Sequence, residues 1–172
     1  MGPSATLVGA QGIYLKYKGK IMGTVNIIKA IKYVHPSCMV IVKVGTFYDV
    51  YSQDAYILSY LMKYKIREKE NIPFCTFPVN SISKVANILE KNKINYIVVD
   101  KRSNYEEEYK EINKQENNYD KIYEKAQKTV EITLRIQRIY NSLIKQREEK
   151  NIEEKIKEIE KIIRKNDKRR KV

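Results

Sequence analysis

The sequence predicts an α/β fold, a small mixed sheet with flanking helices, followed by a C-terminal helical hairpin or one long helix. Between residues 25 and 102, short apolar runs rich in β-branched residues alternate with segments whose apolar residues recur every three or four positions. Beyond residue 119, helical spacing continues over two long stretches. The 172 residues are enough for one domain with a helical appendage.

The first elements follow in order from residue 25. A helical stripe runs from Val25 to Val34 and ends before Pro36, because proline disfavours the helical conformation in the residue before it. Residues 38–44 are apolar almost throughout, as in a central strand covered on both faces. A helix that Asp54 could cap then runs to about Lys65.

The remaining elements of this region are a turn, two strands and a helix. Charged residues 67–70 predict the turn. The second strand, 72–77, contains Pro73, which cannot donate to a ladder, so this strand lies at an edge or starts at the proline. A helix from Ser81 and a third strand at 94–100 complete the set.

Composition divides the chain into four parts. We expect a flexible leader at 1–24, an α/β domain at 25–102, a charged linker at 103–118 and a helical appendage at 119–172. The appendage ends in a basic tail that includes Lys168, Arg169 and Arg170. Solvated charge alone explains such a tail, but it would also bind phosphate backbones.

Charge makes nucleic acid the leading partner class. Thirty-four Lys and Arg against 21 Asp and Glu give a formal net charge of +13, which attracts polyanions. The sequence does not distinguish DNA, RNA and hybrid partners. No apolar run is long enough to span a membrane and no signal peptide is evident, so we expect a soluble, cytoplasmic protein without membrane contact. Cys38, Cys75 and His35 are too few for the usual zinc site, and we expect no metal and no cofactor.

One short motif carries the candidate site. Gly45-Thr46-Phe47-Tyr48-Asp49 follows the first strand and precedes the helix that begins near Asp54. An aromatic side chain at a strand end can stack on a nucleic-acid base, and a carboxylate two residues on can hydrogen-bond it. We take Gly45, Phe47, Tyr48 and Asp49 as candidate contacts, with Lys43 beside them.

This motif and the elements after it resemble the N-terminal mismatch-recognition domain of the MutS family, whose pattern is R-M-G-D-F-Y-E followed by an acid-Ala helix. The resemblance covers about residues 26–102, because the strand with Pro73, the helix from Ser81 and the strand at 94–99 follow in the family's order. It implies that Phe47 stacks on an unpaired or mispaired base from the minor groove. Asp49 would occupy the place of the family glutamate that hydrogen-bonds the base.

The sequence departs from the family in three respects. Asp49 is one methylene shorter than glutamate, Thr46 replaces an aspartate, and the chain has no G-x-x-x-x-G-K-[ST] phosphate loop. We therefore expect a non-catalytic, stand-alone recognition domain without the ATPase part. The resemblance also implies an accessory role beside the reverse transcriptase, or another polymerase, of a diversity-generating retroelement.

Other interpretations of the same residues stay open. Phe47 and Tyr48 could be aromatic packing at the sheet rim, and Asp49 and Asp54 could only cap the next helix. Asp49, Asp54 and Asp100 with Lys101 could form a metal-dependent nuclease, although no strand carries an acid-x-Lys pair. The alternative function is a protein-interaction module that uses the C-terminal helices to bind a partner or a second copy.

Overall fold

The computed structural model describes residues 23–170, so the predicted leader lies almost wholly outside the described residues. The chain forms two compact units that meet between Glu131 and Ile132. The described elements are α2 (Thr24–Val34), β1 (Met39–Val44), β2 (Phe47–Tyr51), α3 (Ser52–Met62), β3 (Arg67–Lys69), β4 (Ile72–Pro78), a 3-10 turn (Val79–Ser81), α4 (Ile82–Lys91), β5 (Tyr96–Asp100), β6 (Glu106–Glu111), α5 (Tyr119–Lys145) and α6 (Ile152–Arg170).

A mixed six-stranded sheet forms the centre of the first unit, with the strand order β3-β4-β2-β1-β5-β6. The parallel partner of β1 is β5, and every other neighbouring pair is antiparallel. The first four residues of β1 are buried, as the apolar run predicts for a central strand. The predicted small mixed sheet with flanking helices is therefore confirmed.

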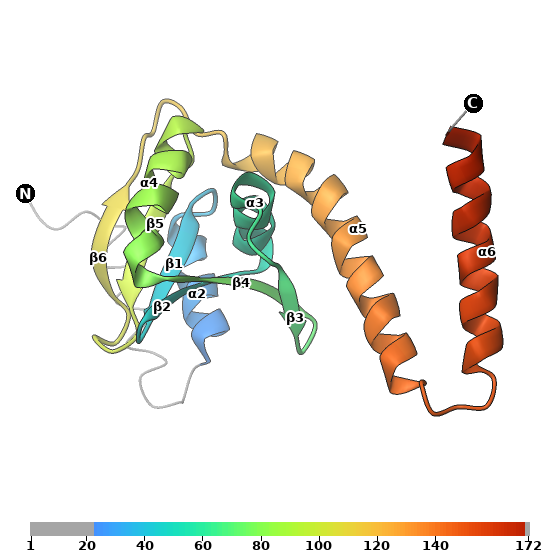
Figure 1. Ribbon diagram of the computed structural model, residues 1–172. Helices are drawn as coiled ribbons and strands as arrows, with labels where there is room; N and C mark the ends of the chain where they lie inside the picture. Colours follow the sequence, from blue (N-terminus) through green and yellow to red (C-terminus); the bar gives the residue numbers. More distant parts are fainter. Residues whose placement is uncertain (1–22, 171–172) are drawn as a thin grey trace, which may run out of the picture. The chain divides into compact units, whose positions relative to one another are not determined.

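Helices cover both faces of this sheet (Figure 1). On one face, Ile28 of α2 packs with Val40 and Val42 of β1 and with Ile97 and Val99 of β5. On the other face lies α4, whose Val85 and Leu89 are fully buried. The alternation of side chains along each strand gives both helices an apolar surface to cover.

Three strands were not expected from the sequence. Phe47–Tyr51 is a strand, β2, rather than a rim segment that leads directly into a helix. Residues 67–70, predicted as a turn, contain β3, and the turn proper is Glu70-Asn71, where both residues have positive φ. As a result β4 lies inside the sheet, although its Pro73 suggested an edge, and it begins one residue before that proline.

The third unexpected strand is β6, which lies in the predicted linker 103–118. All six of its residues are exposed, and the five residues other than Tyr109 are glutamates or a lysine. The charged composition that indicated a linker instead belongs to a sheet edge, where charge discourages pairing with another chain. The linker prediction is wrong for Glu106–Glu111.

A buried hydrogen-bond network ties α2, α3, β1 and α5 together. Asp54 is fully buried in the first turn of α3, and its Oδ1 accepts from Lys32 Nζ at 2.7 Å and from the Tyr119 hydroxyl. Its Oδ2 accepts from the Val40 backbone N–H at 2.9 Å. Asp54 therefore does not serve as the helix cap that the sequence suggested, and its carboxylate joins elements far apart in the chain.

The C-terminal helices are two separate elements, α5 and α6, joined by residues 146–151. Of the two predicted alternatives, the structure has the pair of helices and not the single long helix. The first half of α5 belongs to the first unit and buries Ile122, Ala126 and Val130. The second half forms the second unit with α6. The expected basic tail is helical up to Arg170.

We predict that Tyr119→Phe destabilises the first unit by about 1.5–3 kcal/mol, the range for a hydrogen bond to a charged group. The pKa of Tyr119 is raised first by burial and then by the charge of Asp54. Its hydroxyl therefore stays protonated and donates to Asp54 over the working pH range. Urea unfolding followed by circular dichroism measures the change. The matched control is Tyr33→Phe, since Tyr33 is 81% exposed and we expect its loss to cost under about 0.5 kcal/mol. Equal stability of the two variants would contradict the prediction.

Candidate nucleic-acid interface

Phe47 is presented at the tip of a tight hairpin. Gly45 and Thr46 form the two-residue loop between β1 and β2, and Val44 pairs with Phe47 across it. Gly45 has φ +64°, a conformation that glycine adopts readily at the first loop position of a hairpin turn. The Val79 N–H donates to the Thr46 carbonyl at 3.1 Å, which fixes the loop from the side of β4. The turn thus holds Phe47 half exposed, at 50%.

Side chains of β2 alternate between two faces of the sheet. Tyr48 and Val50 are buried on one face, while Phe47, Asp49 and Tyr51 share the opposite face, the one on which α2 packs. Because directly opposed residues of antiparallel strands lie on one face, Thr76 and Pro78 of β4 join them, and both are exposed. This is the face that α2 covers over β1 and β5, and Tyr51 packs against the core cluster there. The face is exposed only toward the hairpin, around Phe47, Thr76 and Pro78, with Asp49 partly exposed beside them. We call this part, formed by Phe47, Asp49, Thr76 and Pro78, the open face.

Asp49 is held in place by its neighbour on the same face. The Tyr51 hydroxyl donates to Asp49 Oδ2 at 3.0 Å. Burial raises the pKa of Asp49 above its ordinary value of 3.8, and the hydrogen bond from Tyr51 and the charge of Lys101 oppose that shift. One oxygen is thus oriented by Tyr51, and Asp49 remains partly exposed for an outside partner.

Two cations flank the open face, and neither was predicted from the sequence to contact nucleic acid. Lys101 acts electrostatically on Asp49, and the Arg102 guanidinium lies 3.8 Å from the place a Cβ on Gly45 would occupy. Both residues are exposed and follow β5, next to β1 in the sheet. The sequence pattern that could have identified them is a pair of basic residues immediately after an apolar strand. In the fold, this strand ends at the same edge of the sheet as the hairpin loop.

The structure does not bring all the predicted contacts together. Tyr48 is buried and stacks on Phe77 with 5.4 Å between ring centroids, on the face away from Phe47. Lys43 is also on that face, where it pairs with Glu108 at 2.8 Å. Gly45, Phe47 and Asp49 do lie together. Lys168, Arg169 and Arg170 belong to α6, in the second unit.

The described residues offer little for metal or membrane chemistry. Within residues 23–170, no three His, Cys, Asp or Glu side chains are grouped so that they could hold a metal ion. Cys38 and Cys75 are both buried as free thiols, and burial raises the pKa of each to about 12. No helix in the same part of the chain has the length and apolar character of a membrane span.

Comparison with known proteins identifies the fold of the first unit. The family model described as MutS domain I matches residues 23–119, more than half of the chain. The match confirms the resemblance seen around Gly45–Asp49 and extends it beyond residue 102, through β6 to the start of α5. No curated protein matches the chain.

The raised pKa of Asp49 predicts a pH-dependent cost to stability. For an acid whose folded pKa lies above its unfolded value, the stabilisation by the neutral form is complete below that unfolded value and is lost as pH rises through the folded pKa. We therefore expect Asp49→Asn, which can still accept from Tyr51, to gain stability relative to the native chain as pH rises from about 3.8 to 7.

Urea unfolding at a series of pH values checks this expectation. Glu70→Gln serves as the control, because Glu70 is an exposed carboxylate in the β3–β4 turn. A stability difference between Asp49→Asn and the native chain that stays constant with pH would refute the assigned shift.

Proposed function

The chain belongs to the MutS domain I family, and from this premise we propose that it is a non-catalytic nucleic-acid-binding protein that contacts irregular sites in DNA or RNA/DNA duplexes. MutS domain I is a mismatch-recognition domain and carries no catalytic activity of its own. The single observation that carries the proposal is the half-exposed Phe47 at the hairpin tip, with Asp49 on the same open face.

The chemistry of this face suits a disrupted base step. An aromatic side chain pushed between base pairs needs a site where stacking is already weak, such as a bulge or a mismatch, since unstacking a regular step costs a few kcal/mol. Asp49 can then hydrogen-bond the displaced base through its carboxyl group. Lys101 and Arg102 are close enough to the hairpin to contact phosphates beside the kink.

A rigid support behind Phe47 is required if the ring is to act as a wedge. Phe47 follows a loop held by Val79, and its strand lies between β1 and β4 inside the sheet. Tyr48 anchors the same strand from the opposite face, where its buried ring stacks on that of Phe77. We therefore assign Tyr48 a supporting role and give base contact to Phe47 and Asp49.

A second candidate function is self-association through the second unit. Ile132, Ile136 and Ile139 of α5 are each more than half exposed, and Ile156, Ile159 and Ile163 of α6 are 36–55% exposed. The two stripes have the same spacing of four and three residues, which suits packing of this helix pair against a second copy. A polymerase partner, which the family resemblance implied, stays a prediction.

For the proposed function, we expect Phe47→Ala to lower the preference for a bulged over a regular duplex by about 5- to 150-fold, because stacking of an aromatic side chain on a base is worth about 1–3 kcal/mol. Fluorescence anisotropy with matched bulged and regular duplexes of DNA and of RNA/DNA hybrid measures this ratio. Tyr33→Ala is the control, as it removes an exposed aromatic ring from α2. An unchanged ratio in Phe47→Ala would contradict base stacking by this residue.

For self-association, sedimentation velocity of the native chain and of Ile136→Glu/Ile159→Glu is the direct measurement. We expect the native chain to sediment as a concentration-dependent oligomer and the variant as a monomer, since a charge in an apolar interface is unfavourable. A native monomer at every concentration would eliminate the second function. A stable oligomer without affinity for any duplex would eliminate the first.

A further inference from the structure

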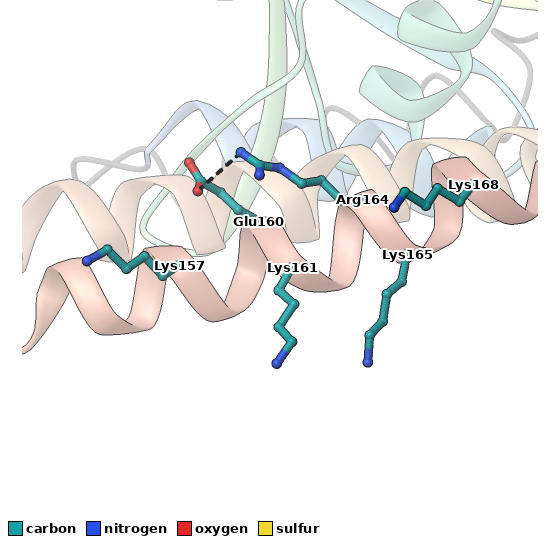
Figure 2. Close-up of a pocket in the computed structure, with 6 residues that line it drawn as sticks. All are labelled: Lys157, Glu160, Lys161, Arg164, Lys165 and Lys168. Atoms are coloured by element: carbon teal, nitrogen blue, oxygen red, sulfur yellow. Dashed lines mark ion pairs between the residues drawn. The ribbon is translucent and has the colours of Figure 1, made fainter.

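A row of cations lies along one face of α6, outside the region that matches the family model. Lys157, Lys161, Arg164, Lys165 and Lys168 line a shallow hollow of about 390 Å³ together with one acid, Glu160 (Figure 2). All six residues are exposed. From Lys157 to Lys168 the row extends over three helical turns, about 16 Å at 1.5 Å per residue.

Little negative charge within the second unit neutralises this row. Glu160 approaches Arg164 at 4.0 Å, the outer limit of an ion pair. Among the described residues, no ion pair involves Lys157, Lys161, Lys165 or Lys168. Lysines four apart, such as Lys157 with Lys161 and Lys161 with Lys165, repel one another on a helix surface. A polyanion that contacts the face would remove this repulsion.

The placement of the row on the helix is also informative. At about 100° per residue, the row is centred roughly opposite the apolar stripe of Ile152, Ile156, Ile159 and Ile163. Because the chain belongs to a family of mismatch-recognition domains, we take a nucleic acid as the polyanion that fits this face, and an anionic membrane is tested as the other outcome.

We propose that this face of α6, which we call the α6 basic face, is a second nucleic-acid contact that binds the phosphate backbone without reading sequence. The inference rests on the proposed function, because it assigns a further surface to the same ligand class. The face presents four lysines and an arginine at intervals of about one helical turn, so several successive phosphates can be neutralised at once. Figure 2 shows Lys161 and Lys165 extending side by side, away from the helix axis.

Counterion release predicts how strongly the affinity for a duplex should depend on salt concentration. Each phosphate contact contributes about 0.9 to the slope of log affinity against log salt on duplex DNA. The triple variant Lys161→Gln/Lys165→Gln/Lys168→Gln should therefore lower that slope by about 2–3. Affinity at low salt should fall at least about 10-fold, by the same factor for bulged and regular duplexes, because backbone contacts carry no sequence information. Glutamine preserves helix propensity, which circular dichroism verifies.

The matched control removes the same charge elsewhere. Lys84→Gln/Lys91→Gln/Lys114→Gln neutralises three exposed lysines from α4 and from the segment after β6. We expect this variant to keep nearly the full salt slope. If both triple variants lose the same affinity, net charge alone explains binding and the assignment of the α6 basic face is overturned.

Further outcomes separate this inference from the proposed function. In one outcome, Phe47→Ala lowers the preference for bulged duplex but the α6 triple variant keeps the native salt slope. This result would overturn the role of the α6 basic face and leave the proposed function standing. A native chain that binds no duplex overturns both. Sedimentation with vesicles of phosphatidylserine and phosphatidylcholine tests the other class of polyanion, and loss of vesicle binding in the α6 variant with unchanged duplex binding would also overturn the inference.

Discussion

The first unit depends on one buried carboxylate. Asp54 has no exposed surface, and an unpaired charge in that position would cost several kcal/mol, so its three donors constrain the elements that supply them. Lys32 fixes α2 on its face of the sheet, the Val40 N–H fixes the start of β1, and Tyr119 fixes the first turn of α5. Removing any one donor leaves the remaining groups poorly satisfied. The network thus connects the sheet that carries the hairpin with the helix that leads out of the unit.

The elements that could be predicted from the sequence are those whose burial leaves a clear apolar pattern. In β1, β5 and α4, burial leaves a continuous apolar run or a clear helical stripe, and each was found near its expected position. In β3 and β6, at the two sheet edges, solvent exposure permits charged residues that look like turns and linkers. In β2 the alternation was hidden, because aromatic residues lie on both faces of the strand, Phe47 and Tyr51 on one and Tyr48 on the other.

The residues of the candidate site could be predicted from the sequence motif, but the face of the sheet on which each one lies could not. Sequence places Phe47 and Asp49 two residues apart, and a strand then puts both on one face, as the structure shows. Lys43 is on the opposite face because it pairs with Tyr48 in the β1–β2 register, and its partner Glu108 comes from a strand that was not expected. The three partners of Asp54 are 14, 22 and 65 positions away in the chain, so no local pattern could distinguish this acid from a helix cap.

The two surfaces proposed for nucleic acid differ in the kind of work they can do. A single aromatic wedge beside two cations offers discrimination but little affinity, since intercalation costs base stacking and is repaid only where stacking is already weak. A row of lysines offers affinity but no discrimination, because phosphates are alike along a duplex. Phe47 is supported by a sheet interior, and the α6 basic face by a single exposed helix. The rigid surface is therefore suited to select the site, and the cationic helix to keep the protein on the strand while that selection takes place.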